Sequence, residues 1–263
     1  MKRAALGSVL GGAALISILT VVARAAGFAR WAVFSPAVGS TAVGSAYTAA
    51  NALPNVLFEI TVGGALAGVV VPLTARALEQ RAMGRVNQIA SALLTWTLTV
   101  TVPLAAVLAL AAKPLAGLLL DGAVEAANPG AVDAAAALLV MFAAQLPLYG
   151  FGLVAGGLLQ AGKRFFWPAL APLVSSLWVI AIYVVFASIA GGHQDQPQAL
   201  PTAALAWLGW GTTGGVALLT LPLLVPLMRQ GVRFRWTYRF GEGAGKRARG
   251  LAGAGLGSLM AQQ

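Results

Sequence analysis

The sequence predicts an all-α polytopic membrane protein, because the chain is strongly apolar, poor in charge and divided into long uncharged runs. Hydrophobic residues make up 59% of its 263 residues and charged residues only 9%, and its mean hydropathy is +0.83. Soluble domains contain about 25% charged residues, so this composition is typical of a chain whose solvent is the bilayer. Helices are expected because an open sheet would leave backbone groups unpaired in lipid.

Six stretches are long enough to cross the hydrocarbon core, which requires about 20 apolar residues in a helix. They are residues 6–34, 41–75, 86–120, 131–159, 165–190 and 201–228. We expect them to form one membrane domain over residues 1–230, followed by a basic cytoplasmic tail over residues 231–263.

Charged residues alternate in sign from one loop to the next, which predicts the orientation. The basic residues are Lys2 and Arg3 before the first span, Arg76, Arg81 and Arg85 after the second, Lys163 and Arg164 after the fourth, and Arg229 after the sixth. The intervening loops contain Asp121, Glu125, Asp133 and Asp195. The positive-inside rule therefore predicts a cytoplasmic amino terminus and supports six spans. The net charge of +10 then reflects topology and anionic lipids, and we expect no nucleic-acid partner.

The tail contains two distinct patterns. Residues 233–240 alternate basic and aromatic side chains, which suits the lipid headgroup region. A solvated stop signal and a specific lipid site both fit this pattern. Residues 251–261 are apolar but too few to span a bilayer, so they predict the truncated start of a seventh helix.

Arg24 and Arg30 are the first candidates for function, because they interrupt an otherwise apolar stretch. A guanidinium inside the bilayer costs roughly 2.5 to 3.5 kcal/mol on insertion scales, so it normally faces a wet cavity, a counter-charge or an anionic ligand. Both arginines could instead flank a conventional helix and extend to the outer interface. That alternative would place positive charge on the side where the loops lack it.

Glu59 is the one acidic residue inside a predicted span, and Asn55 lies one turn before it. Pairing of Glu59 with Arg24 or Arg30 would lower the cost of burying both charges. The same carboxylate could instead carry a proton or a cation, and both interpretations remain open.

Small residues and prolines inside the spans favour close helix packing or hinges. The candidate hinges are Gly27, Pro54, Gly63 and Gly64. No catalytic, cofactor or metal site is expected, because the chain has no cysteine, one histidine and no nucleotide-binding motif. We therefore do not expect an enzyme.

Several segments together resemble one family. They are residues 24–30 (RAAGFAR), 46–47 (AY), 51–55 (NALPN), 63–66 (GGAL), 70–73 (VVPL) and 163–172 (KRFFWPALAP). Their order resembles the MurJ (MviN) family, the lipid II flippases of peptidoglycan synthesis, and in particular its actinobacterial branch.

The resemblance implies a bacterial plasma-membrane exporter of the multidrug/oligosaccharidyl-lipid/polysaccharide superfamily, with two six-helix lobes around a cationic cavity. Arg24 and Arg30 match the first-helix arginines that engage the lipid-linked diphosphate in family members. Phe58 and Ser45 stand where some members have an arginine and an acidic residue. The implied partners are a lipid-linked diphosphate oligosaccharide, membrane lipids, and a second-lobe chain or cell-wall synthesis proteins.

The segments that match belong to the first lobe and the approach to a seventh helix. We therefore expect the N-terminal lobe of a lipid II flippase, incomplete alone. The alternatives are a transport-inactive membrane scaffold or fragment in cell-wall assembly, and an exporter of another polyprenyl-linked glycan or a drug.

Overall fold

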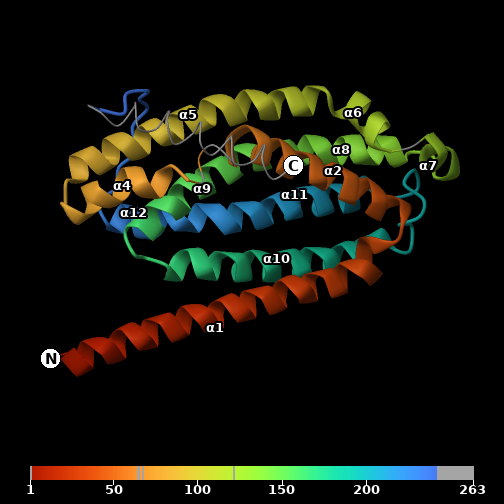
Figure 1. Cartoon of the computed structure of the whole chain (residues 1–263). Helices are drawn as coiled ribbons and strands as arrows, with labels where there is room; N and C mark the ends of the chain where they lie inside the picture. Colours follow the sequence, from red (N-terminus) through yellow and green to blue (C-terminus); the bar gives the residue numbers. More distant parts are fainter. Residues whose placement is uncertain (1, 64–65, 67, 121, 242–263) are drawn as a thin grey trace.

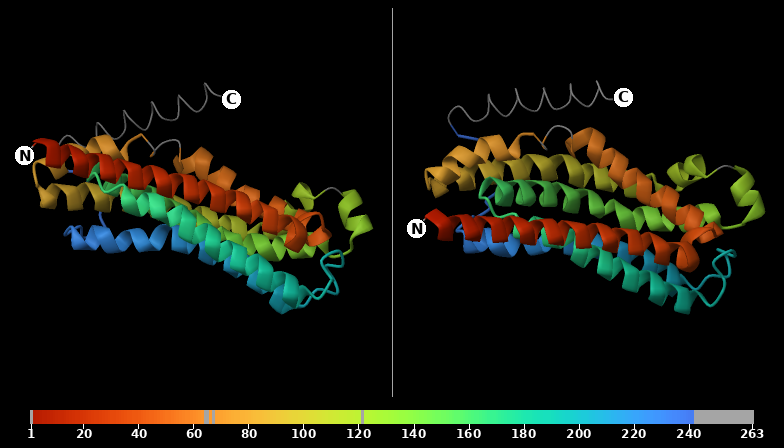
Figure 2. Two further views of the ribbon diagram at one scale, coloured as in Figure 1. Left: turned by 90° about the horizontal axis from the view of Figure 1, so that it is seen from below. Right: turned by 60° about the horizontal axis from the view of Figure 1, so that its bottom comes forward.

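The computed structural model describes residues 2–63, 66, 68–120 and 122–241, and all their regular structure is helical. The predicted all-α fold is confirmed for these residues. Gly64 and the predicted start of a seventh helix at residues 251–261 lie outside them. The α-helices are α1 (Lys2–Phe34), α2 (Ala42–Phe58), α4 (Val70–Glu79), α5 (Met83–Leu110), α6 (Ala112–Leu119), α7 (Gly122–Ala127), α8 (Ala131–Ala143), α9 (Gln145–Ala161), α10 (Phe166–Ala190), α11 (Thr202–Thr220) and α12 (Leu224–Arg229). The long helices lie side by side in an elongated bundle (Figures 1 and 2).

Five helical stretches among the described residues are long and apolar enough to cross a membrane. They are Ala14–Gly39, Met83–Leu110, Ala131–Ala161, Phe166–Ala190 and Thr202–Arg229. They correspond to the first, third, fourth, fifth and sixth predicted spans. The third is shorter than predicted, because α5 ends at Leu110 and the chain continues as the separate helix α6.

The second predicted span is not one continuous helix. Its described parts include α2, a π-helical turn at Glu59–Gly63, and α4. The break follows from local composition, since glycine disfavours the helix interior and Gly63, Gly64 and Gly68 lie close together. The two helices nevertheless follow one another along the bundle (Figures 1 and 2).

The two ends of the bundle differ in charge. One end holds α4, α12, the start of α5 and the loop before α10, with Arg76, Arg85, Arg164 and Arg229 (Figure 1). We call it the basic end. The opposite end holds α6, α7 and the loop over residues 191–200, with Glu125, Asp133 and Asp195, and we call it the acidic end. The structure therefore collects the loops as the predicted charge alternation requires.

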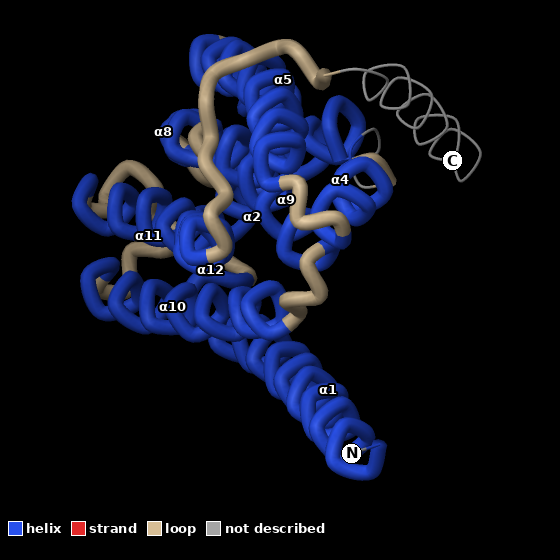
Figure 3. Tube along the Cα trace, turned by 90° about the vertical axis from the view of Figure 1, so that its left-hand side faces the viewer, coloured by secondary structure: helices blue, strands red, loops and turns tan. Residues whose placement is uncertain are grey.

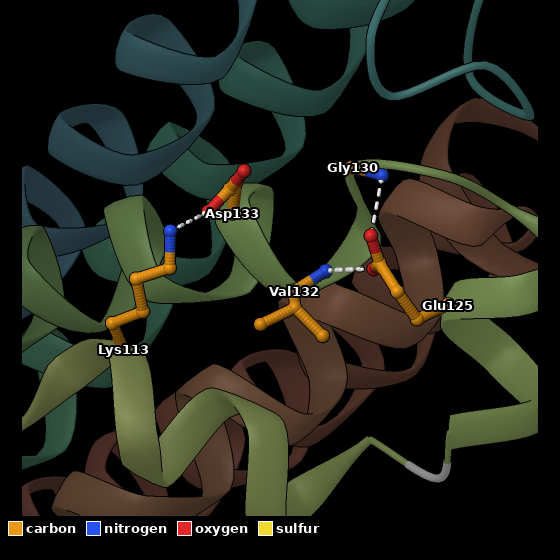
Figure 4. A network of polar contacts seen from close by, with 5 residues as sticks. All are labelled: Lys113, Glu125, Gly130, Val132 and Asp133. Carbon is orange, nitrogen blue, oxygen red and sulfur yellow. Dashed lines mark hydrogen bonds and ion pairs between the residues drawn. The ribbon is translucent and has the colours of Figure 1, made fainter.

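Hydrogen bonds and one ion pair tie the helices together at the acidic end (Figure 4). The Glu125 carboxylate accepts hydrogen bonds from Gly130 N and Val132 N, both at 2.8 Å, at the start of α8. Lys113 of α6 forms an ion pair of 2.9 Å with Asp133 of α8. The hydrogen bond to Asp133 and the charge of that carboxylate raise the pKa of Lys113. The Lys113 ammonium group therefore stays charged at neutral pH.

Glycines bring the helices close together along α9. A side-chain carbon on Gly150 would collide with Thr97 of α5, and one on Gly157 would lie 2.6 Å from Val70 Cγ1 of α4. Gly215 of α11 makes a similar approach to Val179 of α10. These positions support close packing through small residues, as is common between membrane helices.

Helix α1 is the least integrated helix of the bundle. It packs mainly against α10, and its amino-terminal part projects away from the other helices (Figure 3). Its packed positions follow helical spacing and include Ala23, Ala26, Arg30 and Phe34. Much of the opposite surface is apolar and exposed, including Phe28 at 78%.

Candidate functional site

A cavity of about 240 Å³ lies among five helices in the middle of the bundle. Its described lining is Arg30, Trp31 and Phe34 from α1, Tyr47, Thr48, Asn51 and Ala52 from α2, Tyr149 from α9, Ser175, Val179 and Tyr183 from α10, and Thr212 and Val216 from α11. Helices α1 and α2 lie far from α9, α10 and α11 in the sequence, so only the folded bundle creates the site.

Arg30 is the one charged side chain among the described residues that line this cavity. It lies at the edge of the packed face of α1 and is partly buried. Tyr47, Tyr149 and Tyr183 line the same cavity as Arg30. Among the described residues, its guanidinium has no ion-pair partner. The cavity therefore presents a positive charge together with neutral hydroxyl groups.

The wall toward the acidic end is an aromatic and hydroxyl cluster. Tyr47 Oη lies 2.8 Å from Tyr183 Oη and 3.2 Å from Thr212 Oγ1. The ring of Phe34 lies against both tyrosines, with centroid distances of 5.4 Å to Tyr47 and 5.3 Å to Tyr183. The hydrogen bonds join α2, α10 and α11, and the rings add α1. This cluster holds the cavity walls in fixed positions.

A second cluster of hydrogen-bonded side chains lies where α8 ends and α9 begins, at Ala144. The fully buried Gln145 donates through Nε2 to Thr213 Oγ1 at 3.3 Å, and Thr213 donates to the Met141 carbonyl at 3.0 Å. Tyr149 Oη donates to Gln145 Oε1 at 3.2 Å. These bonds satisfy backbone and side-chain groups at the helix break, and they position Tyr149 at the cavity.

Helix α2 contributes a polar stripe of Thr48, Asn51 and Asn55, and Glu59 continues it at the same spacing at the start of the π-helical turn. Thr48 and Asn51 line the cavity. Asn55 and Glu59 are exposed further toward the basic end, and Asn55 Nδ2 donates to the Asn51 carbonyl at 2.7 Å. Sequence reasoning identified only the last two of these four residues.

The predicted charged residues do not come together. Arg24 is exposed and does not line the cavity, and Glu59 is exposed and forms no ion pair with Arg24 or Arg30. The one ion pair between described residues is Lys113–Asp133. Arg24 precedes Arg30 by six residues, which places it about 9 Å along the helix and on another face. It shares the face of Trp31, which is seven residues further on.

The candidate hinges occupy different environments. Gly27 lies within α1, and a side-chain carbon there would contact nothing within 4 Å. Pro54 is buried inside α2, and Gly63 is buried at the end of the π-helical turn, beside the Glu59 carboxylate. These positions are compatible with a bend, and hinge motion stays a prediction.

A second hollow of about 270 Å³ lies nearer the basic end. The two share Tyr149, and the ring of Phe58 lies 5.6 Å from the Tyr149 ring. Apart from Tyr149, Gln160 and Thr220, its described lining is apolar or glycine. Among the described residues, no group of acidic, histidine or cysteine side chains could hold a metal ion.

Sequence reasoning missed most of the cavity lining. Tyr47, Tyr149, Tyr183 and Thr212 stand in apolar helices, where tyrosine and threonine usually serve packing. The available signal was the helical spacing of Thr48 and Asn51 with Asn55 and Glu59 on α2. The partners of these residues on α9, α10 and α11 could be recognised only from the fold.

Comparison with known protein families identifies the chain. The family model described as "Lipid II flippase MurJ" matches residues 34–263. The match includes the cavity residues of α2, α9, α10 and α11, whereas Arg24 and Arg30 precede it. A match over most of the chain, together with several long apolar helices, shows that this multi-pass membrane protein belongs to the MurJ family of lipid II flippases.

Proposed function

We propose that residues 1–230 form the N-terminal lobe of a lipid II flippase, with six spans and a cytoplasmic amino terminus, in which Arg30 binds the substrate diphosphate. The observation that carries this proposal is the partly buried Arg30 in a cavity with three tyrosines. The charge of an arginine is costly to bury in a membrane domain unless an opposite charge or an anionic ligand compensates it. A planar guanidinium matches phosphate oxygens through paired hydrogen bonds. Phenol and amide groups around it can donate further hydrogen bonds.

The size of the cavity limits which part of the substrate enters it. Ligand pockets commonly have volumes of about 300–1,000 Å³, and this cavity has about 240 Å³. It therefore suits the charged linkage of the substrate better than a complete lipid-linked glycan. The sugars and the lipid chain would occupy space beyond this lobe, which supports the idea that a second lobe completes the site.

Arg24 has a different role in this proposal. It is exposed on the face of α1 that also carries Trp31, which lines the cavity. We place it on the route by which the anionic headgroup reaches Arg30. Glu59, exposed on the polar stripe of α2, would lie on the opposite wall of that route. As the cavity opens alternately to each side, one lobe must move against another, so transport requires a second lobe.

Complementation by a complete transporter that carries this lobe tests the proposal. Arg30→Gln should abolish lipid II translocation and growth, whereas Arg30→Lys should retain part of both because it keeps the charge but loses the paired geometry. Arg76→Gln is the matched control, since Arg76 is exposed at the basic end. Normal translocation by Arg30→Gln, at normal protein levels, would instead favour a scaffold role or another substrate.

A further inference from the structure

Residues 232–240, which we call the strap, follow α12, and residues 233–237 run in an extended conformation along α5. The side chains that hold the strap recur every four residues on α5. Arg233 N donates to Asn87 Oδ1 at 3.0 Å, Arg235 N donates to Ser91 Oγ at 2.9 Å, and Thr237 N donates to Thr95 Oγ1 at 3.1 Å.

The spacing of the polar side chains on α5 matches the spacing of the backbone N–H groups on the strap. Four residues of helix rise about 6.0 Å, and two residues of extended chain cover about 6.6 Å. Each second backbone N–H of the strap therefore meets the next polar side chain of α5. This match holds the strap in one register over three successive hydrogen bonds.

Apolar anchors determine which side chains face outward. Val232 is buried, and Phe234 and Phe240 pack against the hydrophobic cluster at the basic end. Arg233, Arg235 and Arg239 are left exposed. No acidic side chain among the described residues forms an ion pair with any of the three.

Three aromatic side chains lie beside these arginines. Trp96, Trp236 and Tyr238 are 48%, 66% and 45% exposed. The ring centroid of Tyr238 lies 5.2 Å from that of Trp96 and 6.1 Å from that of Trp236. Tryptophan and tyrosine are favoured at the boundary between hydrocarbon and headgroups, where an apolar ring and a polar group are both accommodated.

We propose that the strap is a binding site for the headgroups of anionic glycerophospholipids. Arginine forks match the lipid phosphate, and the aromatic side chains match the region just below it. The hydrogen bonds to α5 hold the site in place before a lipid arrives, which lowers the ordering cost of binding. Because α5 and the strap do not line the cavity around Arg30, this site is separate from the proposed transport site.

Native mass spectrometry of the purified chain with phosphatidylglycerol or phosphatidylcholine tests this proposal. The triple variant Arg233→Gln, Arg235→Gln and Arg239→Gln should lower the preference for phosphatidylglycerol roughly a hundredfold. The matched control is Arg76→Gln, Arg81→Gln and Arg85→Gln, which removes the same charge from exposed positions near the end of α4, in the loop after it and at the start of α5. The control should keep most of the preference. An equal loss in both variants would overturn the proposal, because net charge alone would then explain binding.

A second variant tests whether lipid binding needs the strap to be held on α5 or needs only its positive charge. The double change Ser91→Ala and Thr95→Val removes from α5 two side-chain oxygens that accept hydrogen bonds from the strap, but it removes no charge. It should weaken phosphatidylglycerol binding several-fold while helix content stays unchanged by circular dichroism. Unchanged binding would overturn the organised site. Displacement of phosphatidylglycerol by an equal concentration of inorganic phosphate would also overturn it, since the lipid would then contribute nothing beyond its phosphate.

Discussion

Arg30 and Arg24 differ in environment although both were predicted from the same pattern. Arg30 lines the cavity beside Tyr47 and Tyr149, whereas Arg24 is exposed on another face of α1. An arginine within an apolar run could be recognised in the sequence because of its cost in lipid. The tyrosine hydroxyl groups of the cavity could not be recognised in the sequence, because their role depends on which helices they contact.

Arg24 should contribute less to substrate binding than Arg30. In a complete transporter, Arg24→Ala is expected to slow lipid II translocation strongly, and Arg24→Lys should recover part of the rate because charge attraction does not need the guanidinium fork. Translocation rates in reconstituted vesicles measure this. Equal rates for Arg24→Ala and the unaltered transporter would remove Arg24 from the proposed route.

Tyr47 should stabilise the fold through its hydroxyl group. Tyr47→Phe removes hydrogen bonds to both Tyr183 and Thr212, which leaves those buried groups with fewer partners. We expect a loss of about 1–3 kcal/mol in stability, read as a lower melting temperature in detergent. An unchanged melting temperature would show that the two partners find other hydrogen bonds.

At the scale of elements, the sequence predicted the long helices better than the interruptions between them. The length of the uncharged apolar stretches was enough to locate α5, α10 and the stretch from α11 to α12. It was not enough for the second span, where clustered glycines separate α2 from α4, or for the break at Ala144. The strap was also missed as structure. Its alternating sequence indicated a headgroup segment, but its register depends on Asn87, Ser91 and Thr95 of another element.

Neighbouring glycines on α9 allow a direct test of helix packing. Gly157→Ala should lower the melting temperature, because the new methyl group would lie 2.6 Å from Val70 Cγ1, at a cost of about 1–3 kcal/mol. Gly156→Ala is the control, since a side-chain carbon there meets nothing within 4 Å. That change should be neutral or stabilise the helix by about 0.5–1 kcal/mol. Equal effects of the two changes would contradict the close approach of α9 and α4.

For the whole molecule, the bundle places charge of opposite sign at its two ends, which suits one orientation in a membrane. The described residues contain five long apolar helical stretches and one interrupted helical path, so the six-span topology remains a proposal. If α2 and α4 together cross the bilayer, all basic loops share one side. The family match supports lipid II as the substrate, and the cavity around Arg30 supports a diphosphate contact.

Cysteine labelling can test this topology, because the chain has no native cysteine. Ala126→Cys and His193→Cys lie at the acidic end, and Gln80→Cys lies at the basic end, all at exposed positions. In intact cells, a membrane-impermeant maleimide should label only the first two. Labelling of Gln80→Cys in intact cells would mean that residues 41–75 do not cross the membrane in the predicted direction.

The contact between Arg30 and the substrate diphosphate is tested most directly by measuring Kd for lipid II and for its monophosphate analogue, with the unaltered chain and with Arg30→Gln. If Arg30 binds the second phosphate, the unaltered chain prefers the diphosphate by roughly tenfold or more, as expected for a charge-assisted hydrogen bond, and Arg30→Gln loses that preference. If Arg30→Gln weakens both ligands equally and keeps the full preference for the diphosphate, Arg30 does not bind it and the proposed site is wrong.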